Sequence, residues 1–87
     1  MTSSTRPSFW RSYAKLDPTT QEAARKAYRL FEQNPGHPSL QFKKLAGGDQ
    51  VWSVRITSRH RAIGERHGDT ISRTWIGSHK EFDNLFS

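Results

Sequence analysis

The sequence predicts a small α+β domain in which N-terminal helices pack on an antiparallel β-sheet. Apolar side chains recur at helical spacing in the first part of the chain, and from Val51 onward they alternate with polar ones as in strands. The chain has 87 residues, and a chain of this size removes only about 60–65% of its surface from water on folding. We therefore expect one domain over residues 1–87, with no room for a second.

Two helices are predicted before the sheet. The first is short and carries Phe9, Trp10, Tyr13 and Leu16 on one face. Asp17 followed by Pro18 is typical of an N-cap and first helical turn, so a second, longer helix starts there. That helix ends near Asn34, before Pro35 and Gly36, and its apolar stripe is Ala24, Ala27, Tyr28 and Phe31. Residues 1–6, beginning MTSST, are expected to be disordered.

A connecting loop, NPGHPSLQFKKLAGGDQ, leads into three predicted strands, with Leu40, Phe42 and Leu45 holding the loop to the core. The strands are Val51–Ile56, His60–Arg66 and Thr70–Ile76, with a turn at Gly68 and Asp69, and they form a meander. Alternation in the first strand places Arg55 away from the core. Parity alone does not place the arginines of the other two strands. The tail His79–Phe86 fits either a short helix or an irregular cap.

The composition excludes several classes of protein. No cysteine is present, so disulfides, thiolate metal sites and thiol nucleophiles are excluded, and a reducing compartment suits the chain. No apolar run approaches the roughly 20 residues of a membrane span, and the start of the chain lacks the apolar stretch of a signal peptide. We therefore expect a cytoplasmic protein without a membrane partner.

The charge indicates an acidic partner. Fourteen Lys and Arg against eight Asp and Glu give a net charge of +6. Between Lys43 and Lys80, eight basic residues stand against three acidic ones, so most of the excess lies on the loop and the sheet. Such a surface favours nucleic acid first and an acidic protein second. The alternative is that these charges only keep a small sheet soluble.

The residue types in this basic region favour RNA cleavage without a metal. The histidines lie on separate segments with no carboxylate at ligand spacing, so we expect neither a metal nor another cofactor. A metal-free reaction uses the 2′-hydroxyl of RNA as nucleophile and needs an acid or base together with cations at the phosphate. His79, at the exit of a strand, is the candidate acid or base, although it could equally be a capping or packing residue. Arg55 and Arg61 are candidates for phosphate contact, and the candidates for holding RNA are Lys43, Lys44, Arg59, Arg73 and Lys80.

Three segments, NPGHPSLQFKKL, VWSVRITSRHRAIG and WIGSHKEFDNL, together resemble the RelE/ParE superfamily of bacterial toxins over roughly residues 8 to 86. The resemblance implies a microbial-ribonuclease-like fold and a cognate acidic antitoxin that wraps the basic surface. RelE-like members are ribosome-dependent mRNA endoribonucleases that inhibit translation. By segment, their functional positions correspond here to Lys43, Lys44, Arg55, Arg61 and His79.

The chain departs from the ribonuclease members at one position. Phe82 stands where those members often have a tyrosine, so no phenol can act there. ParE-like members share the fold and inhibit DNA gyrase instead, and the superfamily also allows a degenerate toxin that only binds its antitoxin. The resemblance implies an mRNA endoribonuclease first, with these two as alternatives.

Overall fold

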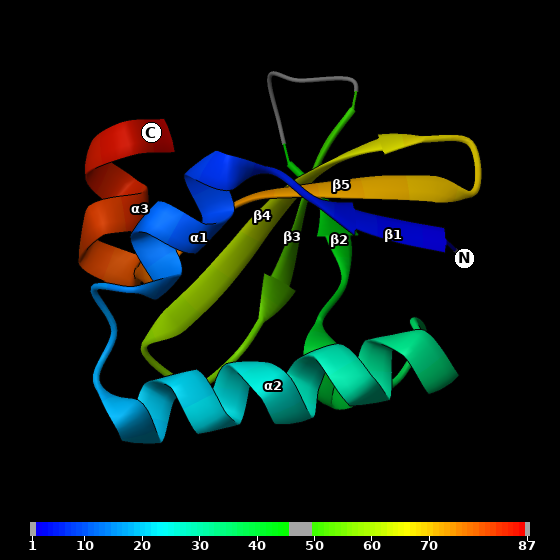
Figure 1. Ribbon diagram of the computed structural model, residues 1–87. Helices are drawn as coiled ribbons and strands as arrows, with labels where there is room; N and C mark the ends of the chain where they lie inside the picture. The colour runs from blue at the N-terminus through cyan, green and yellow to red at the C-terminus, as the bar shows by residue number, and fades with distance from the viewer. Residues whose placement is uncertain (1, 46–49, 87) are drawn as a thin grey trace.

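The computed structural model describes residues 2–45 and 50–86 (Figure 1). The elements of this part of the chain are β1 (Thr2–Thr5), α1 (Pro7–Tyr13), α2 (Pro18–Gln33), the 3-10 helix η1 (Pro38–Leu40), β2 (Lys43–Lys44), β3 (Val51–Arg55), β4 (His60–His67), β5 (Thr70–Ser78) and α3 (His79–Phe86). The predicted α+β class is confirmed. Both predicted helices and all three predicted strands are present, with small shifts at their ends.

The described strands form one sheet in the order β1-β5-β4-β3-β2. Strands β2 to β5 are antiparallel, as predicted, and β1 pairs parallel with β5, so the sheet is mixed. The turn predicted at Gly68 and Asp69 joins β4 to β5. Gly68 has a φ of 63°, a left-handed conformation that glycine adopts without steric cost.

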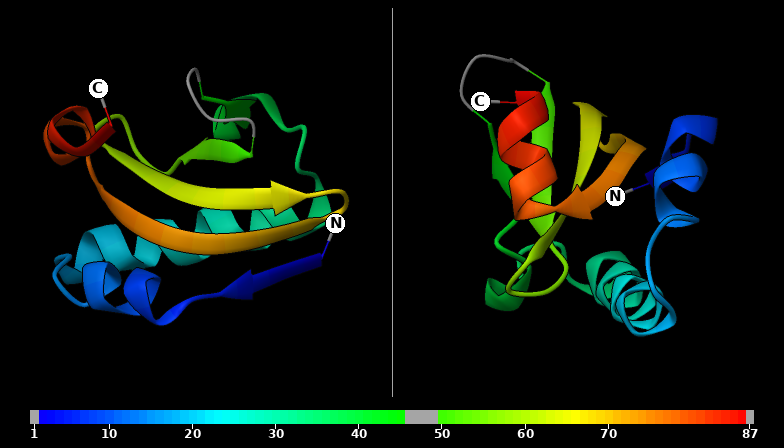
Figure 2. Two further views of the ribbon diagram at one scale, coloured as in Figure 1. Left: turned by 90° about the horizontal axis from the view of Figure 1, so that it is seen from above. Right: turned by 90° about the vertical axis from the view of Figure 1, so that its left-hand side faces the viewer.

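Helices α1 and α2 lie on one side of the sheet, which we call the helix face, and α3 lies at the end of the strands toward the other side, the open face (Figure 2). The predicted stripe of α2 is confirmed, with Ala24, Ala27 and Phe31 buried against the sheet. Apolar strand residues complete this core from the other layer, namely Ile71 and Ile76, with Trp52, Val54 and Ile56 packed at its margin. Burial of this stripe, with Leu30 packed beside it, is what holds α2 to the sheet.

Helix α1 protects the outer edge of β5 where β1 ends. The β1–β5 ladder closes with the Arg6 amide donating to the Arg73 carbonyl at 2.9 Å. Beyond it, the Ser8 hydroxyl donates to the Thr74 carbonyl at 2.7 Å, and the Ser12 hydroxyl accepts from the Ile76 amide at 3.1 Å. Two serine side chains therefore satisfy backbone groups that a further strand would otherwise have to pair.

Three details differ from the sequence expectations or complete them. The disorder expected for residues 1–6 is wrong at Thr2–Thr5, which form β1, because pairing with β5 satisfies the backbone of this polar segment. The connecting loop contains η1 and β2, and Leu40 in η1 is only 2% exposed, so it does hold the loop to the core. The tail, left open between a helix and a cap, is helix α3.

Candidate active site

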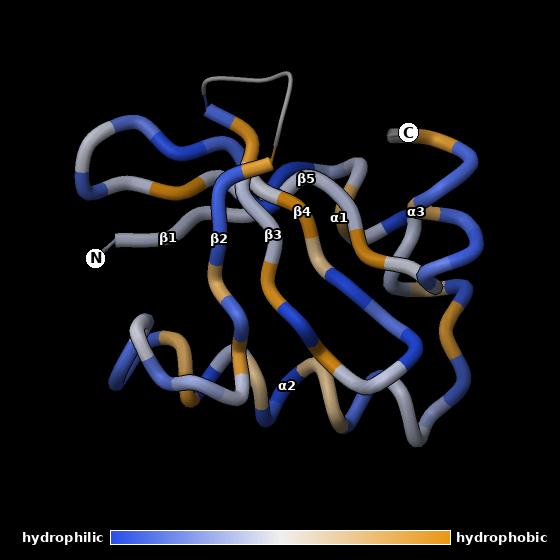
Figure 3. The backbone as a smooth tube through the Cα atoms, turned by 180° about the vertical axis from the view of Figure 1, so that it is seen from behind, coloured by the Kyte–Doolittle hydropathy of each residue, from blue (hydrophilic) through white to orange (hydrophobic). Residues whose placement is uncertain are grey.

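The open face ends in a cluster of basic side chains beside the start of α3. His79 is the first residue of α3 and follows β5 directly, and its amide donates to the carbonyl of Arg59 at 2.7 Å. That contact ties the turn between β3 and β4 to the helix. In the register of the sheet, Arg61 lies opposite Arg55 on β3 and opposite Gly77 on β5. Figure 3 shows the hydrophilic end of the β3–β4 hairpin beside α3.

The guanidinium of Arg61 joins this cluster to the interior of the sheet. Its Nε donates to Nε2 of His79 at 3.2 Å, and its Nη1 donates to the hydroxyl of Ser53 at 3.2 Å. Because Nε2 of the ring accepts this hydrogen bond, the proton of the neutral imidazole sits on Nδ1. Ser53 is fully buried, so one side of the Arg61 fork is fixed by the sheet and the other reaches the exposed imidazole.

Arg55 is held less firmly. Its Nε donates to the carbonyl of Thr57 at 3.4 Å, and the residue also lines a groove of about 380 Å³ at the edge of β3 beside α2 and η1. It nevertheless lies directly across the ladder from Arg61. Like charges opposite each other on neighbouring strands repel at close range, so an anion between the two guanidinium groups would relieve that repulsion.

The structure separates the residues predicted to hold RNA. Arg59 and Lys80 are exposed next to His79, one in the β3–β4 turn and one in α3. Lys43 pairs with Ser53 in the ladder and so lies on the open face, whereas Lys44 pairs with Trp52 and points toward the opposite side. Lys43 can therefore extend the basic surface along the sheet, and Lys44 can do so only from the edge.

Arg73 is not part of this cluster, because it lies on the helix face. Its guanidinium stacks over the ring of Tyr28, 3.9 Å from the centroid, and lies 5.1 Å from that of Phe9. It also donates to the hydroxyl of Thr5 in β1. The pKa of Arg73 is lowered, because the effect of burial outweighs the opposing effects of Tyr28 and Glu32. Arg73 thus lies across the sheet from His79, apart from the other residues predicted to hold RNA.

Two residues important for the site were not found from the sequence. Ser53 looked like an ordinary polar strand position, and the only available signal was a small hydroxyl between two apolar strand residues. Gly77 lies opposite Arg61, and a Cβ at this position would come within 2.6 Å of Cη2 of the Trp75 indole. The indole therefore occupies the space over Gly77, on the same strand end as the Arg61 contact.

The remaining histidines have local roles. Nδ1 of His37 accepts from the amide of Ser39 at 3.2 Å, and Nδ1 of His60 lies 2.9 Å from the hydroxyl of Thr57. His67 faces Glu65 at 3.7 Å at the far end of β4. Within residues 2–45 and 50–86, no three His, Asp or Glu side chains gather as a metal site would require.

Comparison with known proteins identifies the family. A family model described as the ParE-like toxin domain matches residues 18–84. The chain belongs to the ParE-like toxin family. The fold of this ParE-like toxin is shared with RelE in the RelB–RelE antitoxin–toxin complex of Methanococcus jannaschii, at 15% identity and a TM-score of 0.78 over 97% of this chain and 99% of that one.

Two further solved structures share the fold. YafQ from Escherichia coli BL21(DE3) is 10% identical with a TM-score of 0.74, over 98% of this chain and 97% of that one. The YoeB/ParE toxin of Agrobacterium tumefaciens is 23% identical with a TM-score of 0.67, over 91% and 99%. No curated protein sequence matches the chain. Among the described residues, no helix is both long and apolar enough to cross a membrane.

Proposed function

We propose that this ParE-like toxin is a metal-free mRNA endoribonuclease that acts with the ribosome in the cytoplasm and is neutralised by a cognate acidic antitoxin. The observation that carries the proposal is the contact between Arg61 and His79 on the basic open face. It joins a proton-transfer group to a phosphate-binding group at one point, which is the minimum that cleavage through the 2′-hydroxyl needs.

The hydrogen-bond arrangement suggests how the step proceeds. In the free protein, Nε2 of His79 is occupied by Arg61. When a phosphate enters, the Arg61 fork turns to its non-bridging oxygens, with Arg55 on the opposite strand as the second cation. The freed Nε2 then accepts the proton of the 2′-hydroxyl. The 2′ oxygen bonds to phosphorus, the bond to the 5′ oxygen breaks, and that oxygen takes a proton from water, leaving a 2′,3′-cyclic phosphate and a 5′-hydroxyl. The proton held on Nε2 of His79 then neutralises the hydroxide formed from that water and restores the neutral imidazole.

The openness of the site supports a role for the ribosome. His79 and Lys80 are exposed, and so are Arg59 and Lys43. An exposed imidazole by itself does little to orient RNA, so a second surface that holds the RNA would raise the rate. Orientation of this kind contributes strongly to rate, because well-aligned groups can replace about 7–11 kcal/mol of the barrier. A ribosome that presents mRNA to the open face would supply it.

The antitoxin proposal has separate support. The net charge of +6 favours an acidic protein partner. Several solved structures of this fold are toxin–antitoxin complexes, including RelB–RelE from M. jannaschii and the intact E. coli RelBE complex.

Inhibition of DNA gyrase is the second candidate function. It is favoured by the match to the ParE-like family model, since ParE-like members of the superfamily resemble this chain and act on gyrase. In that case the open face is a protein-binding surface, and the imidazole of His79 has no proton to transfer. The signature would be stabilised DNA breaks in a gyrase supercoiling assay.

The test is primer extension on cellular mRNA after brief induction of the wild type, His79→Ala and His67→Ala, with equal accumulation checked. His67 is the matched control, because it is an exposed histidine of the same sheet at the far end of β4. We expect new cleavage sites within translated frames for the wild type and His67→Ala, and none for His79→Ala. Growth arrest with intact mRNA in all three strains would overturn the proposal in favour of gyrase, and normal growth would indicate a degenerate toxin. Repeating the reaction with purified components, with and without ribosomes, tests ribosome dependence.

A further inference from the structure

A groove of about 300 Å³ runs between α1 and α2 on the helix face, across the sheet from His79. Aromatic side chains form its walls, with Phe9, Trp10 and Tyr13 on α1 and Tyr28 on α2. Trp10 is 51% exposed and packs edge to face on Tyr13, with ring centroids 5.4 Å apart. A large aromatic ring held in place yet half open to solvent is typical of a surface that a partner covers.

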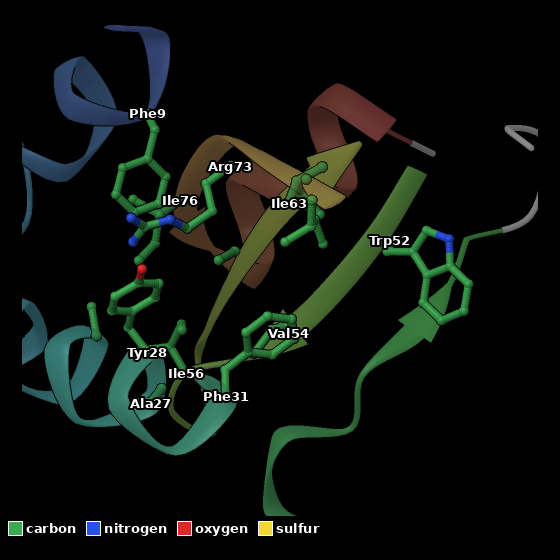
Figure 4. Close-up of a pocket in the computed structure, with 14 residues that line it drawn as sticks. Phe9, Ala27, Tyr28, Phe31, Trp52, Val54, Ile56, Ile63, Arg73 and Ile76 are labelled. Atoms are coloured by element: carbon green, nitrogen blue, oxygen red, sulfur yellow. The ribbon is translucent and has the colours of Figure 1, made fainter. Parts of the chain in front are cut away.

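A positive charge with no carboxylate at ion-pair distance among the described residues lies at the floor of this groove, and Glu32 acts on it only from farther away. Figure 4 shows the guanidinium of Arg73 between the rings of Phe9 and Tyr28. Within the described chain, no acidic group comes within ion-pair distance of Arg73, and its buried Nε has no hydrogen-bond acceptor. Among the described residues, the guanidinium donates only to the hydroxyl of Thr5. A half-buried cation is costly without a counter-charge, and the ring faces compensate only partly.

The rim of the groove is also basic. Arg25 and Arg29 lie along it on α2, together with Glu32. Arg25 is paired with Glu22 at 2.6 Å, whereas the contact of Arg29 with the same carboxylate is 4.0 Å long. Arg29 is therefore available to a second acidic group in the same groove.

We propose that this groove binds an acidic segment of a partner protein, with one carboxylate on Arg73, a second near Arg29, and apolar side chains against Trp10 and Tyr28. This inference rests on the proposed antitoxin and names the site it occupies. Aromatic walls suit the apolar side chains of a peptide better than a phosphate backbone. A partner bound in this groove contacts the helix face of the toxin, on the opposite side of the sheet from His79.

The test measures binding of the protein encoded beside the toxin gene to full-length toxin carrying His79→Ala, which permits expression. Arg73→Met is compared with the matched control Arg66→Met. Arg66 also lies on the helix face and stacks on an aromatic ring, with its guanidinium 4.7 Å from the centroid of Trp52, but it does not line this groove. Loss of one partner of a desolvated charge pair predicts affinity lower by roughly 30-fold or more for Arg73→Met. Arg66→Met should change it by less than about threefold.

A second pair of variants leaves the core intact. Arg29→Glu and Lys26→Glu make the same charge change on the exposed surface of α2, but Lys26 lines the other groove, beside η1. At physiological salt we expect Arg29→Glu to weaken binding by roughly fivefold or more, and Lys26→Glu by less than about twofold.

The outcomes separate the two proposals. An equal loss of affinity in Arg29→Glu and Lys26→Glu would overturn the proposed binding site while leaving the antitoxin proposal in place. Unchanged binding by folded Arg73→Met would do the same. If the neighbouring protein does not bind the parent toxin at all, both the antitoxin and the groove are wrong, whereas mRNA cleavage is still tested by primer extension. Binding of a single-stranded oligoribonucleotide that is lost in Arg73→Met and retained in Arg66→Met would assign the groove to nucleic acid and overturn the inference.

Discussion

Replacement of Gly77 by alanine tests how the strand end beside α3 is packed. The new Cβ would lie 2.6 Å from Cη2 of the Trp75 indole and 3.2 Å from Oε1 of Glu81. Unstrained carbon atoms approach to about 3.5–4.0 Å, so the indole must move by about 1 Å or leave its rotamer. Overpacking of this kind costs about 1–3 kcal/mol, and we expect the free energy of unfolding to fall by that amount.

The measurement is urea unfolding followed by tryptophan fluorescence, with Gly36→Ala as the control. A Cβ at Gly36 meets only Oδ1 of Asn34 at 3.7 Å, an ordinary contact, so that variant should stay within about 0.5 kcal/mol of the wild type. Combining Gly77→Ala with Trp75→Leu removes the ring that the methyl group displaces. The double variant should therefore be more stable than the sum of the two single changes predicts, by about 1 kcal/mol.

An unfolding free energy for Gly77→Ala equal to that of Gly36→Ala would refute this account of the packing. It would also weaken the placement of the active site, because Gly77 is the ladder partner of Arg61. If the account holds, displacement of the indole disturbs the Arg61 contact with His79, and mRNA cleavage should fall along with stability. An alanine variant that is destabilised yet cleaves normally would show that Trp75 and Arg61 are independent.

Three further predictions concern stability. Leu40→Ala removes a side chain that is only 2% exposed and should lower the free energy of unfolding by about 2–5 kcal/mol in urea titrations. Ser12→Ala leaves the amide of Ile76 without its acceptor and should cost about 1–3 kcal/mol, whereas a cost near zero would mean that water replaces the hydroxyl. The hydrogen bond from Arg25 lowers the pKa of Glu22, so its small contribution to stability is present above the ordinary glutamate pKa and lost as pH falls through the lowered pKa. Thermal unfolding across that acidic range should show a shallower pH dependence for Glu22→Gln than for the wild type.

Local patterns in the sequence were enough to predict most of the fold. The stripe of α2 and the alternation in β3 are visible in a few consecutive residues, because the side chains of one face meet the same layer. Strand β1 has no such pattern. Its sequence TSST is polar throughout, and what makes it a strand is the unpaired edge of β5, more than sixty residues away. Pairing partners at that distance cannot be found from propensity.

The residues of the candidate site could be predicted from the sequence, but the contacts between them could not. His79 and Arg61 could be proposed singly, because imidazole and guanidinium groups in a basic region suit phosphate chemistry. Their contact depends on the hairpin that brings β4 beside β5, and the anchoring of Arg61 by Ser53 depends on β3 as well. Neither contact is encoded in the spacing of the residues.

Arg73 shows why strand parity could not place the arginines of β5. Arg73 and Trp75 are two residues apart and should share one face of a regular strand. The register between β4 and β5 shifts at Ile63 and Gly64, so that Ile63 pairs with Trp75 while the next residue, Gly64, pairs with Arg73. Thr74 is the extra residue of a bulge, and a bulge of one residue exchanges the two faces of the strand.

The bulge has a consequence for function. It places Arg73 among the aromatic rings of the helix face and leaves Trp75 with the Arg61 contact on the other. Strand β5 thereby contributes side chains to both faces of the sheet. The two proposals therefore predict that variants on the two faces act independently. His79→Ala should abolish cleavage and preserve partner binding, and Arg73→Met should do the reverse. Coupled loss of both activities in either folded variant would mean that the faces do not act separately.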